Sequence, residues 1–165
     1  MSDEEQANLT MQCAAPNKRP VKNDAMRRRA CEIMMDRLVS ARMWDADDVD
    51  GAVEDLMQVT KYEDSDGYRI ARELDRQCGW NNDGDYADKF DQFWGILHDL
   101  FRKAETQWAA ENMMKQEFFE GDQVVWRDEA CTICGVTRDL PFYYLIRTAI
   151  CRGSSEILVP FEDVS

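Results

Sequence analysis

The pattern of apolar residues changes once along this chain, and this change constrains the fold more than any other feature. Up to about residue 118, apolar residues recur every three or four positions, the period of an amphipathic helix. After Gly121-Asp122 the chain carries short runs rich in Val, Ile, Thr and aromatic residues, separated by turn-forming residues. We therefore predict an α+β protein, with an acidic helical domain over 24–118 followed by a small antiparallel β-barrel over 121–165.

Residues 1–22 are polar and show no apolar period, so we expect them to form a disordered tail. About four helices are predicted after this tail, each with an acidic or amide residue near its start. The last one is expected to be long, running from about Asp85 toward Phe118, either straight or kinked. The starts of the other three are predicted at Asn23 or Asp24 with Asp24 as the cap, after Asp48, and after Ser65 or Asp66.

Four strands are predicted in the C-terminal segment, joined by turns into an antiparallel meander. Because so few strand residues cannot support an open, two-sided sheet, closure into a small barrel is the expected arrangement. The predicted strands are Gln123–Trp126, Cys131–Thr137, Phe142–Ile150 and Glu156–Pro160.

The C-terminal segment resembles a known kind of small barrel. It begins Gly121-Asp122-Gln123-Val124, continues with Gly135-Val136 and Tyr143-Tyr144-Leu145-Ile146, and ends Val159-Pro160-Phe161. These runs are similar to SH3-like barrels of the Tudor or KOW kind, and the resemblance covers about 45 of the 165 residues. It implies a fold and no particular function, because such barrels serve many.

The negative charge of the chain is concentrated in its middle. The formal net charge is −13, and residues 45–120 hold twenty acidic and eight basic side chains. A pI near 4.5 argues against direct binding to nucleic acid or to an anionic membrane, because both surfaces repel an acidic protein. Residues 45–66 hold nine carboxylates and Lys61 as the single lysine, which is more acid than helix capping needs. We expect the basic cluster Arg27-Arg28-Arg29 to pair with some of these acids.

This acidic excess has two interpretations. It is either a solvated surface that only keeps the protein in solution, or a face that binds a basic partner. Spaced carboxylates on rigid helices imitate duplex phosphates and compete for the same basic surface. We favour a non-enzymatic inhibitor that occupies the basic, nucleic-acid-binding surface of a partner protein. Its candidate contacts are Asp47, Asp48, Asp50, Glu54, Asp55, Asp64, Asp66, Asp85, Asp88 and Asp91.

In size, charge and lack of catalytic motifs, the chain is similar in style to small acidic phage-type inhibitors, such as anti-CRISPR and anti-restriction proteins. No residue motif defines those groups, so the resemblance implies DNA mimicry or blockade without assigning any site. An alternative hypothesis is an adaptor whose barrel recognises a peptide or nucleic acid through its aromatic residues. The candidate contacts for that function are Trp126, Tyr143, Tyr144 and Phe161.

A third hypothesis is a metal- or thiol-dependent protein that uses Cys131 and Cys134. The two cysteines fall within one predicted strand, where residues three apart face opposite sides, too far apart for a disulfide. A zinc site needs four ligands, and only Cys151 and His98 remain as candidates. We therefore expect ordinary strand cysteines, no catalytic residues, no cofactor and no metal site.

The sequence also bears on the compartment. Its start, MSDEEQ, is acidic and is not followed by the apolar run of a secretory signal. The longest apolar run, Phe142–Ile146, is far shorter than a membrane-spanning helix requires. We therefore expect a cytoplasmic protein with reduced thiols.

Overall fold

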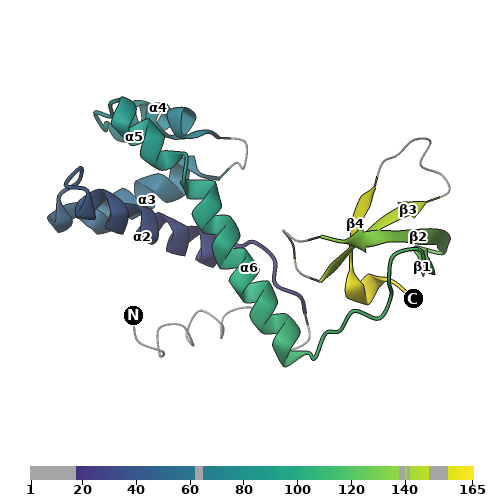
Figure 1. The fold of residues 1–165 in the computed structure, drawn as a ribbon. Coiled ribbons are helices and arrows are strands. Elements are labelled where there is room, and N and C mark those ends of the chain that lie inside the picture. The colour runs from purple at the N-terminus through teal and green to yellow at the C-terminus, as the bar shows by residue number, and fades with distance from the viewer. Residues whose placement is uncertain (1–17, 62–64, 138–139, 141, 149–155) are drawn as a thin grey trace. The chain divides into compact units, whose positions relative to one another are not determined.

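The computed structural model describes residues 18–61, 65–137, 140, 142–148 and 156–165. Within these residues, helices come first and a four-stranded antiparallel sheet follows, which confirms the predicted α+β layout (Figure 1). The described residues divide into two compact units. The helical unit comprises Pro20–Lys103, and the sheet unit comprises Lys18, Arg19 and Ala104–Ser165. Among the helices of this described part, none has the length and apolar character that crossing a membrane demands.

Helix α2 (Asp24–Ser40) opens the helical unit. Its cap is Asn23 and not the predicted Asp24, because the Asn23 backbone is extended and its side chain accepts a hydrogen bond from Met26 N at 3.0 Å. Asp24 instead takes a place in the first turn, where a carboxylate favours the helix dipole. The buried face of α2 consists of Met26, Ala30, Cys31, Met34, Met35 and Leu38.

The next two helices lie where the sequence predicted them. A 3-10 turn, η1 (Ala46–Asp48), leads into α3 (Val49–Val59), and α4 (Gly67–Cys78) follows. Asp66 caps α4 by accepting a hydrogen bond from Arg69 N at 2.7 Å. Gly79 ends the helix in the left-handed conformation, with φ +76°, which costs a glycine little.

The predicted fourth helix is two helices, α5 (Gly84–Phe90) and α6 (Phe93–Glu111). The break lies where α4 and α5 meet. Gly67 N donates a hydrogen bond to Asp91 Oδ1 at 2.6 Å, and a Cβ on Gly67 would lie 2.1 Å from the Ala87 carbonyl oxygen. The start of α4 is therefore in direct contact with the end of α5, and Asp91, the C-cap residue of α5, accepts the hydrogen bond from it.

Helix α6 also ends before the predicted Phe118. Met113 adopts a left-handed conformation with φ +52°, and Met114 N donates to the Ala109 carbonyl at 2.9 Å. These features form a Schellman-type helix end. The segment that follows is held on the sheet instead, because the Tyr144 hydroxyl accepts hydrogen bonds from the backbone N–H groups of Glu117 and Phe118.

The sheet consists of β1 (Gln123–Trp126), β2 (Glu129–Val136), β3 (Tyr143–Thr148) and β4 (Ile157–Pro160), paired in chain order. The predicted antiparallel meander is therefore confirmed. A two-residue turn joins β1 to β2, and both of its residues have positive φ angles, as the hairpin twist requires.

The term barrel describes this sheet only loosely, because β1 and β4 do not pair with each other in the described residues. Both edge strands are short, and the chain after β4 turns through η2 (Phe161–Asp163). Two backbone hydrogen bonds between Val125 and Ser165 then connect this chain to β1. One face of the sheet is buried, with a core of Val124, Cys131, Ile133, Tyr144, Ile146, Val159, Phe161 and Val164.

Candidate functional site

Two tryptophans from distant parts of the sequence join two acidic segments of the helical unit. The Trp44 and Trp80 rings stack with 4.0 Å between their centroids and 25° between their planes. The Tyr86 hydroxyl also donates a hydrogen bond to the Met43 carbonyl. The loop after α2 is therefore held against the segment between α4 and α5. This contact places the acids that follow Trp44 close to those that precede Tyr86.

Both indole N–H groups fix acidic parts of the chain. Trp44 Nε1 donates to the Asp48 carbonyl at 3.3 Å, and Trp80 Nε1 donates to the Asp55 carboxylate at 2.8 Å. The first bond holds the turn η1 against Trp44, and the second ties α3 to Trp80. The acidic segments are thus positioned by aromatic packing and directional hydrogen bonds, without basic counter-charges at these points.

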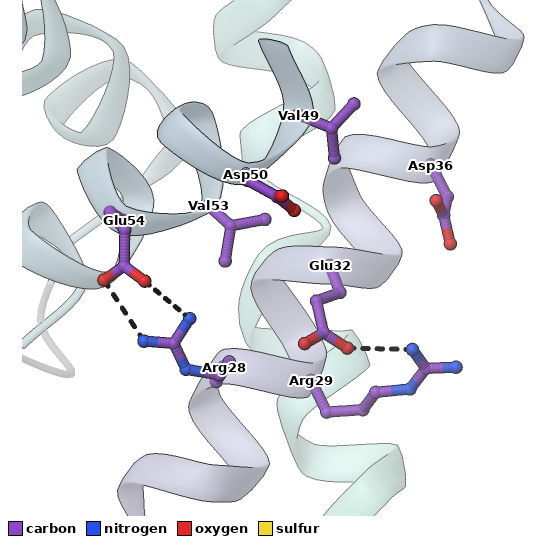
Figure 2. Close-up of a pocket in the computed structure, with 8 residues that line it drawn as sticks. All are labelled: Arg28, Arg29, Glu32, Asp36, Val49, Asp50, Val53 and Glu54. Atoms are coloured by element: carbon purple, nitrogen blue, oxygen red, sulfur yellow. Dashed lines mark hydrogen bonds and ion pairs between the residues drawn. The ribbon is translucent and has the colours of Figure 1, made fainter. Parts of the chain in front are cut away.

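A shallow hollow of about 480 Å³ lies between α2 and α3 of the same unit (Figure 2). Figure 2 shows Arg28 of α2 reaching across to Glu54 of α3, while Arg29 bonds Glu32 on its own helix. The rest of the lining adds carboxylates without further basic side chains. The hollow is lined by Arg28, Arg29, Glu32, Asp36, Val49, Asp50, Val53 and Glu54.

The Arg28–Glu54 pair is bidentate, with N–O distances of 2.7 and 3.1 Å. The hydrogen bonds from Arg28 hold the pKa of Glu54 below its ordinary value. This pair confirms for Arg28 the predicted pairing of the basic cluster with the acids of 45–66. Arg27 instead pairs with Asp24, at 3.1 Å. The four carboxylates and two guanidinium groups of the hollow leave it a net negative charge.

The structure separates the predicted acidic contacts into three groups. Glu54, Asp55, Asp66 and Asp91 are occupied with the structural bonds described above. Asp64 lies outside the described residues. The remaining five are exposed, and within the described part of the chain their carboxylates have no hydrogen-bond or ion-pair partner. We call these five the acidic face: Asp47, Asp48, Asp50, Asp85 and Asp88.

Sequence reasoning missed the residues that assemble this face. Trp44 and Trp80 were given no role, although each directly follows a predicted helix and stands beside an acidic segment. Asp45 and Asp83 serve as caps, since their carboxylates accept hydrogen bonds from the backbone N–H groups of Asp47 and Asp85. Asp36 was also missed, because its place in the hollow depends on how α2 packs on α3.

The aromatic residues proposed for the sheet have different environments. Tyr144 and Phe161 are buried and stack on each other at 4.1 Å, so they belong to the core. Trp126 is partly buried under the Arg127 guanidinium, which lies 4.6 Å from the ring centroid. Tyr143 contacts the Arg19 guanidinium at 4.2 Å. The four residues therefore do not form one exposed aromatic surface.

Cys31, Cys78 and Cys134 are free thiols among the described residues. Cys131 is buried in the sheet core, and Cys134 lies at a β-bulge between Ile133 and Gly135. Burial raises the pKa of the Cys31 thiol to about 12, and burial together with Asp55 raises that of Cys78 to about 11. Over the described ranges, no three or more His, Cys, Asp or Glu side chains are grouped so that they could hold a metal ion.

Comparison of this chain with known protein families, with curated proteins and with solved structures finds no match.

Proposed function

We propose that this protein is a non-enzymatic binding protein whose acidic face occupies a basic, nucleic-acid-binding surface of a partner protein. The observation that carries the proposal is the assembly of the acidic face. The Trp44–Trp80 stack holds the loop that leads into η1 and α3, which carry Asp47, Asp48 and Asp50, against the segment that leads into α5, which carries Asp85 and Asp88. An acidic surface that served solubility alone would need no such fixed arrangement.

The electrostatics favour a basic protein as the partner. Unpaired carboxylates close together repel each other, and a positive surface removes that repulsion on binding. Fixed negative charges also accelerate association with a positively charged site. The proposed action is blockade: the acidic face takes the place of the nucleic-acid phosphates, as a DNA mimic does, and the partner loses its substrate. Inhibition of the phage anti-defence kind is one setting for such an action.

The free thiols are consistent with the proposed cytoplasmic location. Cys31, Cys78 and Cys134 are free thiols in the described structure, as expected in the reducing cytoplasm. A nucleic-acid-handling protein of the same compartment would be available to the acidic face.

The proposal is tested by neutralising the face and asking what the protein still captures. The variant Asp47→Asn, Asp48→Asn, Asp50→Asn, Asp85→Asn, Asp88→Asn removes five charges without changing side-chain size. A charge-matched control removes five exposed carboxylates elsewhere, through Asp99→Asn, Glu117→Gln, Glu120→Gln, Asp128→Asn and Asp163→Asn. We expect the first variant to lose partner capture from a lysate of the source cells and the control to retain it. Equal capture by both variants would overturn the proposal.

A further inference from the structure

In the sheet unit, aromatic rings and carboxylates both contact one arginine side chain, Arg19. Its guanidinium lies 4.2 Å from the ring centroid of Tyr143 and 5.1 Å from that of Trp108. Its edges meet the carboxylates of Glu105 at 3.2 Å and Glu162 at 2.8 Å. Arg19 falls within the tail predicted over residues 1–22, for which the sequence predicts no role.

The groups around Arg19 come from separate elements of the sheet unit. Glu105 and Trp108 lie one turn apart on α6, Tyr143 begins β3, and Glu162 belongs to η2. Arg19 Nη2 also donates to the Phe142 carbonyl at 3.0 Å. The tertiary fold of the unit therefore builds this site from parts that are remote in sequence.

Two features show that the site is built for a guanidinium and not for any cation. Aromatic rings contact it, and two acceptors, Glu105 Oε1 and the Phe142 carbonyl, receive hydrogen bonds from its Nη1 and Nη2 groups, which suits a planar group with several N–H donors. The Phe142 carbonyl is presented from a backbone with φ +68°, a conformation that a bulky side chain rarely adopts. A lysine ammonium could pair with one carboxylate but could not lie flat on a ring and reach the other acceptors.

The site cannot remain empty without cost. Glu105 is fully buried, and its Oε1 accepts hydrogen bonds from Arg19 Nη1 at 3.2 Å and from the Tyr143 hydroxyl at 3.1 Å. Burial raises the pKa of Glu105, and the charge of Arg19 opposes that rise. Without a cation, the carboxylate would be an uncompensated buried charge. A vacated site is therefore relieved either by a proton on Glu105 or by another cation beside it.

Arg19 also leaves part of the site unused. Among the described residues, Glu105 Oε2 is a buried acceptor with no hydrogen-bond partner, and Arg19 Nε is a buried donor with none. An arginine that entered from another direction could donate to both carboxylate oxygens, the bidentate geometry that a guanidinium prefers. Arg19 thus occupies the site but leaves one oxygen of the Glu105 carboxylate without a hydrogen bond.

We propose that this is an arginine-binding site, which Arg19 fills within the chain and which takes the arginine side chain of a partner polypeptide when Arg19 is withdrawn. The site lies in the sheet unit and does not depend on the acidic face. Since Arg19 is part of the same chain, its effective concentration is high, and it acts as a built-in competitor of the partner's arginine.

The test uses the full chain with Arg19→Ala and acetyl-arginine amide as the probe. We expect saturable binding, seen as a shift of the Trp108 indole N–H signal in NMR and as a rise in Tm. Acetyl-lysine amide should bind at least tenfold more weakly. The unaltered protein should show no shift at the same probe concentration, because Arg19 holds the site. Adding Glu105→Gln to the variant should abolish binding.

The test remains decisive if Arg19→Ala is poorly folded, because saturable refolding by the arginine probe but not by the lysine probe is the same result. Arg19→Lys serves as a second variant, in which a charge stays beside Glu105 and the probe is expected to displace the substituted side chain at higher concentration. The proposal is overturned if neither variant binds the arginine probe, if the lysine probe binds equally well, or if Glu105→Gln has no effect. Variants of the acidic face leave these results unchanged, so failure here is distinguishable from failure of the proposed function.

Discussion

The Trp44 indole lies stacked on Trp80 across 36 residues of sequence, with 4.0 Å between the ring centroids. Each ring also donates a hydrogen bond to an acidic residue of the η1–α3 segment, Asp48 or Asp55. One aromatic pair therefore contributes to packing and to the placement of charge. Changes at this pair are expected to affect both stability and partner binding.

The first prediction concerns the stability that this pair supplies. Trp80 is almost fully buried, so Trp80→Ala should lower the free energy of unfolding by about 3–5 kcal/mol. Trp44 is more exposed, and Trp44→Ala should cost about 1–2 kcal/mol, much of it from the lost ring contact. Tyr68→Ala is the control, because Tyr68 is 68% exposed and should change stability by less than about 0.5 kcal/mol. Urea denaturation measures all three, and equal effects of Trp80→Ala and Tyr68→Ala would contradict the packing described.

The second prediction concerns Gly67. A Cβ at this position would lie 2.1 Å from the Ala87 carbonyl oxygen and 2.4 Å from Asp91 N, both backbone atoms that cannot turn aside. Gly67→Ala should therefore cost about 3 kcal/mol or more in unfolding free energy. Gly95→Ala is the matched control, since Gly95 lies within α6 with no atom within 4 Å of its Cβ position. Gly95→Ala should raise the free energy of unfolding by about 0.5–1 kcal/mol. A tolerated Gly67→Ala would mean that α4 and α5 do not approach this closely.

How far the sequence predicted the fold depends on whether local or tertiary forces decide each feature. The positions of α3, α4 and the strands follow from capping residues, apolar period and turns, all of which act over a few residues. The break between α5 and α6 lies where Asp91 bonds Gly67, a residue 24 positions away. A sequence pattern does not reveal such a contact, and the apolar stripe continues through the break.

The candidate sites show the same division. The acids were evident from charge alone, but their sorting into occupied and unpartnered carboxylates depends on tertiary contacts such as Trp80–Asp55. Tyr144 was proposed as a contact residue and is a core residue, because alternation along a strand does not tell which face is covered. Arg19 could not be recognised, since its partners Glu105 and Tyr143 are 86 and 124 residues away.

The third prediction concerns the charge on Glu105. Because its pKa is raised in the folded state, the folded protein holds the proton more tightly, and stability falls as pH rises above about 4.5. Arg19→Ala removes the charge that compensates Glu105 and should lower the free energy of unfolding by about 3–5 kcal/mol at pH 7. The loss should be clearly smaller at pH 5, because protonation of Glu105 removes the buried charge. Arg147→Ala is the control, since the exposed Arg147–Glu156 pair should contribute less than about 1 kcal/mol at either pH. An Arg19→Ala effect independent of pH would contradict the buried pairing.

The fourth prediction concerns thiol reactivity. With a pKa of about 12, Cys31 is protonated and buried at pH 8 in the folded protein, so a thiol reagent should leave it unmodified until the protein unfolds. The same raised pKa means that the contribution of the Cys31 thiol to stability is constant below about pH 9 and falls as pH rises toward 12. Peptide mapping after brief alkylation measures this directly. Rapid native labelling of Cys31 would contradict its burial against Thr60.

The acidic face is proposed to bind a basic, nucleic-acid-binding surface of the partner. Exposed charges contribute about 0.5 kcal/mol each, so neutralising Asp47, Asp48, Asp50, Asp85 and Asp88 should weaken partner binding by roughly 50-fold or more. Added salt should weaken binding of the unaltered protein and have less effect on the neutralised variant.

The most direct measurement is a titration of the captured partner, bound to labelled duplex DNA, with the unaltered protein and with each five-charge variant. We predict that the unaltered protein and the charge-matched control displace the DNA, and that the variant of the acidic face fails to do so at the same concentrations. Displacement of the DNA by the acidic-face variant as efficiently as by the unaltered protein would show that the acidic face does not make the contact.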